Sequence, residues 1–171
     1  MNRYLLAFFL IFSLPVLADQ QICQKDIPST TPTERFTSNT TDVVTDNKTN
    51  LMWKRCGEGQ SGSACIGKTK NYTLEQAVDY VKNLNKGAGI EGYTDWRLPT
   101  VMELKSLVEE QCVNPSINLQ VFPNSTPKAF WSSSPFAGIS GYVWYVNFNQ
   151  GYDNYVNSNY TGNYIRLVRN K

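Results

Sequence analysis

The chain of 171 residues contains no histidine. This absence excludes Ser–His and Cys–His nucleophilic pairs and any general acid–base step carried by an imidazole. It also removes one of the common protein ligands of zinc. An enzyme built on this sequence would have to work with carboxylates, tyrosines or lysines.

A strong excess of charge is lacking as well, since 16 Lys and Arg residues face 14 Asp and Glu residues and give a formal net charge of +2. A nearly neutral chain has no long-range field that attracts nucleic acid or an anionic membrane. We therefore predict no nucleic-acid partner. After the first 18 residues, no apolar run of the sequence is long enough to cross a membrane.

The first 18 residues, "MNRYLLAFFLIFSLPVLA", have the pattern of a secretory signal peptide. One positive charge, Arg3, precedes a short apolar run, and small residues end it at Ala18. The alternative is a membrane anchor, but the run is short and contains Pro15. We expect cleavage after Ala18, no membrane insertion of the mature chain, and export to the periplasm, the cell surface or the medium.

Four cysteines follow the expected cleavage site. In an oxidising compartment disulfides are the default, and four cysteines allow three pairings. Cys56 and Cys65 bracket the flexible loop "GEGQSGSA", which favours a Cys56–Cys65 bond and leaves Cys23–Cys112. The spacings fit no zinc pattern. We predict no metal or cofactor; calcium binding stays open, although no motif indicates it.

Local patterns predict the elements of the first half. Residues 19–34 read as an irregular arm, and residues 35–56 read as a β-meander with a tight turn at "TDNKTN". In "YTLEQAVDYVKNLNKG", Thr73 and Gln76 form a capping box, apolar residues recur at helical spacing, and Gly87 follows the expected end.

The stretch "GYTDWRLPTVMEL" (92–104) concentrates charged residues and has two interpretations. The first is a catalytic cluster. The second is a structural joint in which a short strand at Trp96 leads through proline into a capped helix, with Thr100 and Glu103 as the capping box and an internal ion pair. We favour the joint, because it explains each residue, and expect the helix to end near Cys112.

The last third of the chain is rich in aromatic and Asn residues, and "YVWYVNF" followed by "NQG" predicts a strand and a hairpin turn near Gly151. "FWSSSP" reads as a further short strand, and "NYIRLVR" reads as the closing strand. We expect Trp131 and Trp144 in the core. The residues expected to bind a ligand are Tyr145, Asn147, Tyr152, Asp153, Tyr155 and Asn157.

The blocks "TDNKTNLMWKRC", "GYTDWRLPTVMEL", "FWSSSPFAG", "WYVNFNQG" and "YIRLVR" occur in the order in which they occur in the Lcl C-terminal domain family, and the chain resembles this family from about Arg35 to Arg169. The resemblance implies a single domain over 35–171. The residues that carry the structural motif are Trp53, Asp95, Trp96, Arg97, Thr100, Glu103, Trp131, Trp144 and Arg166.

The family is similar in fold to C-type lectins and formylglycine-generating enzymes. The resemblance therefore implies an α+β, C-type-lectin-like domain. In such a domain two helices flank a small twisted antiparallel sheet with long loops, and disulfides cross-link the chain. The namesake domain ends a collagen-like bacterial adhesin and is associated with sulfated glycans and adherence. This chain lacks the Gly-X-Y stretch of that adhesin and the Glu-Pro-Asn motif of calcium lectins.

Three functions remain open. We expect a non-catalytic module that binds glycans through the aromatic and Asn-rich sheet. Tyr rings can stack on sugar rings, and Asn side-chain amides can form hydrogen bonds with sugar hydroxyls. An alternative is a surface or pilus-associated structural protein with a protein partner, bound at an exposed strand edge. A carboxylate-dependent hydrolase is disfavoured, because Glu109 and Glu110 are adjacent on the expected helix and point apart. The sequence leaves the oligomeric state open.

Overall fold

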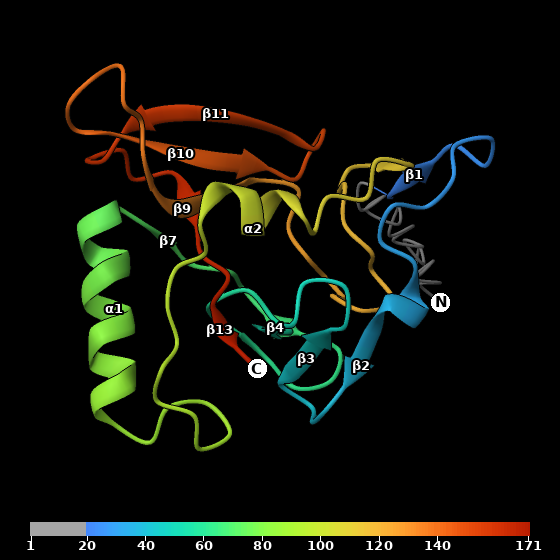
Figure 1. Cartoon of the computed structure of the whole chain (residues 1–171), viewed down its shortest axis with the longest axis horizontal. Helices are drawn as coiled ribbons and strands as arrows, with labels where there is room; N and C mark the ends of the chain where they lie inside the picture. The colour runs from blue at the N-terminus through green and yellow to red at the C-terminus, as the bar shows by residue number, and fades with distance from the viewer. Residues whose placement is uncertain (1–19) are drawn as a thin grey trace, which may run out of the picture.

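The computed structural model describes residues 20–171, so the expected signal peptide lies outside the described residues. The described part is an α+β fold composed mostly of strands, with two α-helices, one short 3-10 helix (Thr33–Arg35) and four sheets. Figure 1 shows the two larger sheets at opposite sides of the molecule, with α2 between them and α1 at one end. Within residues 20–171, no helix is long and apolar enough to cross a membrane.

The larger sheet has five strands in the order β11-β10-β9-β12-β7. The strands are β7 (Asn71–Tyr72), β9 (Ala129–Pro135), β10 (Tyr142–Asn147), β11 (Tyr152–Asn157) and β12 (Asn163–Tyr164). The β10–β11 hairpin confirms the predicted turn, in which Gly151 has a φ of 78° that favours glycine. β12 pairs with β9 in parallel, so the expectation of a purely antiparallel sheet is wrong.

The second sheet has the order β13-β4-β3-β2 and contains the predicted meander. Its strands are β2 (Phe36–Ser38), β3 (Val43–Asp46), β4 (Leu51–Lys54) and β13 (Val168–Asn170). Two further sheets have two strands each: β1 (Ile22–Cys23) with β8 (Cys112–Val113), and β5 (Gln60–Ser61) with β6 (Ile66–Gly67). The expectation of one small sheet is therefore too simple.

The segment "NYIRLVR" was expected to form one closing strand, and this is wrong. Its two ends belong to different sheets, β12 and β13, and residues 165–167 between them are buried. A chain that crosses from one sheet to another cannot keep one set of strand partners. The crossing places Arg166 inside the molecule rather than on a strand face.

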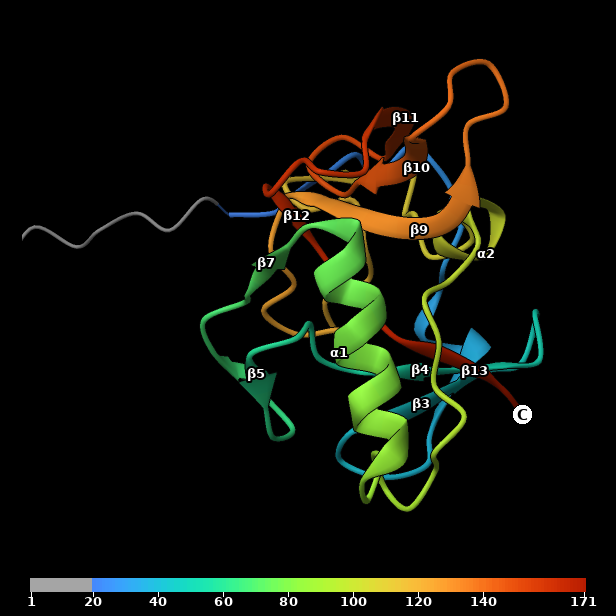
Figure 2. The same cartoon turned by 90° about the vertical axis from the view of Figure 1, so that its left-hand side faces the viewer.

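Helix α1 (Leu74–Lys86) begins and ends where the sequence predicts. Thr73 and Gln76 form both hydrogen bonds of the capping box, and the N–H of Gly87 donates to the carbonyl of Leu84. The helix buries Ala77 and Val81. Figure 2 shows α1 standing beneath β9, with β3, β4 and β13 to its side.

Helix α2 (Val101–Lys105) has the predicted capping box but ends well before Cys112, so the expected length is wrong. The chain turns after Lys105 and the Ser106 hydroxyl donates to the carbonyl of Glu103 at 2.6 Å. Farther on, Glu109 bonds the N-terminal arm and Cys112 enters β8. Residues 109–113 make these contacts with the N-terminal arm in a non-helical conformation. The local helical pattern of the sequence does not indicate such long-range contacts.

Two clusters of buried side chains hold the sheets together. The first lies between the two larger sheets and α2 and includes Trp53, Leu104, Phe130 and Val146. The second joins α1 to both sheets and includes Trp96 and Trp131 among others. Trp53, Trp96 and Trp131 are each at most 2% exposed, as expected of core residues.

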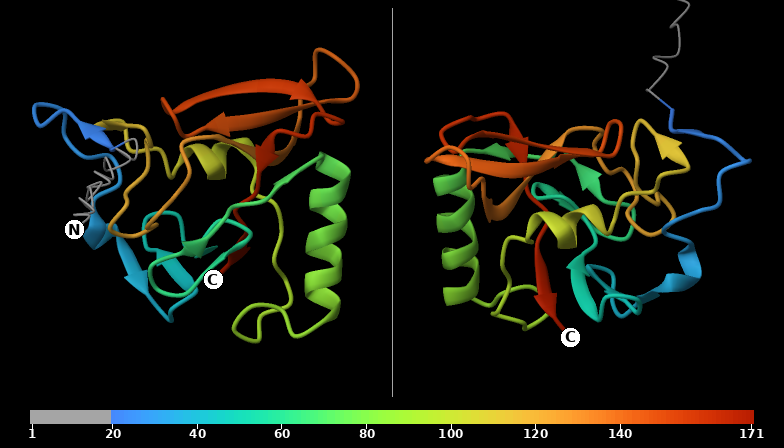
Figure 3. Two further views of the ribbon diagram at one scale, coloured as in Figure 1. Left: turned by 180° about the vertical axis from the view of Figure 1, so that it is seen from behind. Right: turned by 45° about the horizontal axis from the view of Figure 1, so that its top comes forward.

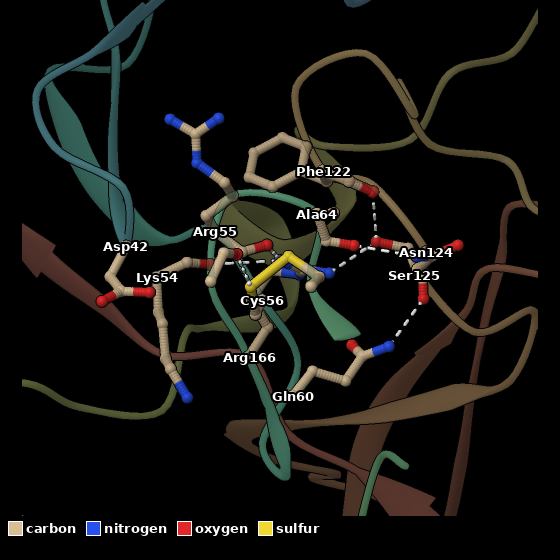
Figure 4. Close-up of a disulfide and its surroundings, with 12 residues drawn as sticks. Asp42, Lys54, Arg55, Cys56, Gln60, Ala64, Phe122, Asn124, Ser125 and Arg166 are labelled. Carbon is tan, nitrogen blue, oxygen red and sulfur yellow. Dashed lines mark hydrogen bonds between the residues drawn. A yellow bond between two sulfur atoms is a disulfide. The ribbon is translucent and has the colours of Figure 1, made fainter. Parts of the chain in front are cut away.

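Both predicted disulfides are present. Cys23–Cys112 ties β1 to β8, where the two cysteines are direct partners in the sheet. Figure 3 shows the arm that carries β1 on the side of the molecule away from α1. Cys56–Cys65 closes the loop around β5 and lies beside Arg166 and Gln60 (Figure 4).

The charged stretch at Trp96 is a structural joint. The Arg97 guanidinium donates to both carboxylate oxygens of Glu103 at 2.7 Å, and Asp95 instead pairs with Arg169. The expected short strand is reduced to a single bridge between Arg97 and Val168. Each charged side chain of the stretch is therefore explained by a partner within the fold.

Replacing Glu103 with alanine is expected to lower the free energy of unfolding by about 1–2 kcal/mol, because it removes half of the capping box and the partly exposed ion pair to Arg97. The measurement is urea unfolding at pH 7. Glu75→Ala is the matched control, because Glu75 also lies in the first turn of a helix. Equal losses in both variants would contradict the assignment.

Candidate functional site

The β10–β11 hairpin separates the six predicted ligand-binding residues into two groups. Side chains alternate along a strand, and directly paired residues share a face of the sheet. Tyr145, Asn147 and Tyr152 therefore lie on one face. Asp153, Tyr155 and Asn157 lie on the other face, so the six cannot contact one small ligand together.

On the second face, each predicted residue is engaged within the chain. The Asp153 carboxylate lies 2.7 Å from the Lys105 ammonium of α2. Asn157 Oδ1 accepts a hydrogen bond from the backbone N–H of Asn159 at 3.0 Å. Tyr155 stacks on Phe136, with ring centroids 3.7 Å apart and planes 9° from parallel.

Trp144 belongs to the same face, and the expectation that it lies in the core is wrong. It is half-buried and meets Phe136 and Tyr155 edge to face. Val146, two residues farther along β10, is fully buried in the cluster that contains Leu104 of α2. Because α2 has only five residues, it covers this part of β10 and leaves Trp144 to pack with its aromatic neighbours.

The first face borders a cavity of about 470 Å³, which we call the Tyr160 pocket. A cavity of this volume can hold a small ligand or one unit of a polymer. Among residues 20–171, Lys128 supplies the only charged side chain in its wall, and no carboxylate of this part of the chain lines it. The wall consists of Pro127, Lys128, Ala129, Tyr145, Asn147, Asn149, Val156, Tyr160, Gly162 and Asn163.

Hydrogen bonds fix the sheet side of the Tyr160 pocket. Asn147 Nδ2 donates to the Tyr152 hydroxyl at 2.9 Å, and Asn147 Oδ1 accepts from the backbone N–H of Asn149 at 2.8 Å. Burial raises the pKa of the Tyr145 hydroxyl, and the nearby Tyr152 and Tyr160 raise it further. The Tyr145 hydroxyl therefore stays protonated at neutral pH.

Tyr160 forms the outer wall of the pocket and is 51% exposed. Its ring lies directly against Gly162: a Cβ at position 162 would lie 2.5 Å from the ring carbon Cζ. Glycine at 162 therefore permits the observed position of the ring. Any larger residue would force the Tyr160 ring to move from this position.

Asn163 is the least expected residue of the pocket. It lies in β12, is 1% exposed, and its Nδ2 has no hydrogen-bond partner. An unpaired buried donor costs free energy, and such groups are rare in folded proteins. Because Nδ2 itself has almost no accessible surface, this donor does not face the solvent side of the pocket.

The carboxylates do not gather into a site. In the described part of the chain, Asp46, Glu58, Asp95, Glu103 and Asp153 each pair with a Lys or Arg. No group of three Asp, Glu, Cys or His side chains between residues 20 and 171 is placed to hold a metal ion.

Eight of the ten wall residues were not predicted from the sequence, among them Lys128, Tyr160 and Asn163. Tyr160 belongs to the Asn- and Tyr-rich run "NSNYTGNY", which was a visible signal. Asn163 gave no separate signal, because its burial follows from the pairing of β12 with β7 and β9. Lys128 lies before β9, far from the hairpin in sequence.

The fold and the pocket define a small α+β domain with two disulfides and a wall of tyrosine and amide side chains. Residues 42–169 match the family model of the Lcl C-terminal domain, and the chain belongs to this family. The match confirms the resemblance noted from the sequence blocks. A comparison with curated proteins gives no match.

Proposed function

We propose that this chain is an exported, non-catalytic module that binds glycans in the Tyr160 pocket and serves in adhesion. The observation that carries the proposal is a cavity walled by the tyrosines Tyr145 and Tyr160 and by the amide residue Asn147. A sugar offers ring faces for the tyrosines and oxygen atoms for the amide. Exposed Tyr contributes contact area at a low cost in conformational entropy.

The proposal includes a C-type-lectin-like arrangement of the fold and export through the signal peptide. Two disulfides support an oxidising compartment. The ion pairs of the carboxylates support a binding role over hydrolysis, because a paired carboxylate is a poor general acid.

A glycan array probed with the oxidised protein tests the proposal. We expect binding that is equal with calcium and with a chelator. Tyr160→Ala should weaken binding about tenfold, because it removes the outer stacking wall. Tyr155→Ala is the matched control, because this exposed tyrosine lies on the opposite face and should leave binding unchanged.

Gly162→Ala provides a second variant that removes no polar side chain from the pocket. Its methyl group should displace the Tyr160 ring and reduce binding as Tyr160→Ala does. Binding that is lost with chelator would contradict a metal-free site. The absence of binding to any glycan by folded, oxidised protein would contradict the proposal and favour a protein partner at β11, the longer of the two edge strands of the larger sheet.

A further inference from the structure

The exposed side of helix α1 carries four charged residues in one line. Glu75, Asp79, Lys82 and Lys86 recur at the spacing of successive helical turns, so their side chains form a single stripe along the helix. All four residues are exposed, and the stripe lies opposite the side of the helix that packs into the core. The first half of this charged stripe is acidic, and the second half is basic.

Contacts within the chain do not explain this order of charges. None of the four side chains forms an ion pair within residues 20–171. Glu75 and Asp79, and likewise Lys82 and Lys86, are like charges four positions apart, an arrangement that destabilises a helix. The helix dipole favours Glu75 in the first turn and Lys86 in the last turn, but its effect falls off within those turns. The dipole therefore leaves Asp79 and Lys82 unexplained.

The charged stripe is complementary to itself when two copies of α1 lie antiparallel. A two-fold axis midway between residues 80 and 81 places Glu75 of one copy opposite Lys86 of the other, and it places Asp79 opposite Lys82. Every acid of the stripe then faces a base of the second copy. Two parallel copies in register would instead bring like charges together, so the pattern selects the antiparallel arrangement.

Val78 adds apolar area beside the charged stripe. It is 50% exposed and lines a groove of about 500 Å³ that Arg97, Leu98 and Thr100 also line. A two-fold axis keeps equivalent residues on the same side of a helix pair, so both Val78 side chains lose exposure together. Because exposed ion pairs contribute little by themselves, this apolar contact adds to the stability of the helix pair.

The surroundings of α1 leave room for a second copy. Figure 1 shows α1 at one end of the molecule, where no helix or strand of residues 20–171 lies outside it. The chain has a formal net charge of only +2, so two copies repel each other weakly. Two helices of 13 residues are each about 20 Å long and bury less area than a standard interface, so we expect a low affinity that depends on salt.

We propose that α1 is the contact surface of a symmetric dimer, in which the α1 helices of two copies of this chain lie antiparallel. Glu75 of each copy faces Lys86 of the other, and Asp79 of each copy faces Lys82 of the other. The dimer carries two Tyr160 pockets, but the inference does not depend on what these pockets bind.

Sedimentation equilibrium of the oxidised mature protein tests the dimer. We expect a monomer–dimer equilibrium whose dissociation constant rises at least about tenfold between about 20 mM and about 500 mM salt, because salt screens exposed ion pairs. Cysteine exchange between copies does not account for such a dimer, since the described chain has no free cysteine. A protein that stays monomeric at about 1 mM in low salt would overturn the proposal.

Charge reversal tests the antiparallel register. Asp79→Lys and Lys82→Glu each turn two attractive contacts of the dimer into repulsive ones, so each variant alone should self-associate about tenfold more weakly than the wild type. A mixture of the two variants restores both contacts, and we expect a heterodimer about as tight as the wild-type dimer. Lys and Glu both favour helices, and far-UV circular dichroism establishes that the variants are folded.

Lys25→Glu is the matched control, because it makes the same change in net charge on the exposed N-terminal arm, which lies away from α1 (Figure 3). It should self-associate as the wild type does, and its mixture with Asp79→Lys should associate more weakly than the mixture of the two α1 variants. Equal weakening by Lys25→Glu would overturn the proposal. A mixture of the α1 variants that associates no more tightly than each variant alone would also overturn it.

Discussion

Replacing Arg166 with alanine is expected to lower the free energy of unfolding by about 3–5 kcal/mol, the largest loss among the substitutions considered. Arg166 is 1% exposed, and its side chain lies between the loop of the Cys56–Cys65 disulfide and the Ser125 segment (Figure 4). It donates to the carbonyls of Lys54 and Arg55, and it donates to the Ser125 hydroxyl at 2.7 Å.

The expected loss has two parts. Alanine leaves three buried oxygens without a donor, and it leaves a cavity against the rings of Phe122 and Phe130, which now lie 4.8 and 5.9 Å from the guanidinium carbon. Burial lowers the pKa of Arg166 to about 9, and the Glu58 carboxylate opposes this shift, so the side chain is charged at pH 7.

Urea unfolding of the oxidised protein measures the effect, and Arg166→Met separates its parts. Methionine refills most of the cavity without supplying donors, so we expect it to recover about 1–2 kcal/mol of the loss. A loss below about 1 kcal/mol in the alanine variant would show that water replaces the guanidinium at the three oxygens. Full stability in the methionine variant would show that the hydrogen bonds make no net contribution.

Glu109→Gln is expected to produce the second largest effect, a loss of about 2–3 kcal/mol at pH 6–7. Glu109 is 3% exposed, and its carboxylate has no Lys or Arg partner within 4.0 Å in the described chain. It accepts hydrogen bonds from the hydroxyls of Ser29 and Thr31 at 2.5 and 2.8 Å, and from the backbone N–H groups of Thr30 and Thr31 at 2.9 and 3.0 Å.

The sign of the pH dependence follows from these contacts. Burial alone would raise the pKa of Glu109, but the donors of the arm outweigh it and lower the pKa from 4.5 to about 2. The folded state therefore favours the ionised Glu109 carboxylate more than the unfolded state does. The stabilisation is complete above pH 4.5 and is lost as the pH falls towards 2.

The measurement is urea unfolding of the wild type and of Glu109→Gln between pH 7 and pH 2. The difference between the two proteins should shrink towards zero over the lower part of this range. Glu110→Gln is the matched control, because Glu110 is exposed and adjacent in sequence. A difference that stays constant with pH would mean that the carboxylate charge does not hold the arm.

An element of this fold could be predicted when the residues that stabilise it lie close together in the sequence. The helix at Thr73, both capping boxes and the β10–β11 hairpin follow from residues a few positions apart, and all were predicted. The Cys56–Cys65 bond also closes a short loop, and its assignment left only Cys23–Cys112. The length of α2 was predicted wrongly, because the arm and β1 compete for the residues that follow it.

The candidate site was predicted only in part. Tyr145 and Asn147 line the pocket, and Tyr152 supports it through Asn147. The sequence could not show that Asp153 would pair with Lys105 or that Tyr155 would stack on Phe136, because those partners come from α2 and from the loop after β9. The pocket wall also needs Lys128 and Asn163, which only the assembled sheet brings to the hairpin.

The sequence by itself determined the family, the disulfide framework, the absence of histidine chemistry and the local elements, since each depends on residue identity or on neighbours within a turn or a hairpin. The tertiary structure decided which face of the hairpin borders a cavity and which buried groups lack a partner. Those properties depend on segments that are distant in sequence and meet only when the two larger sheets and the N-terminal arm pack together.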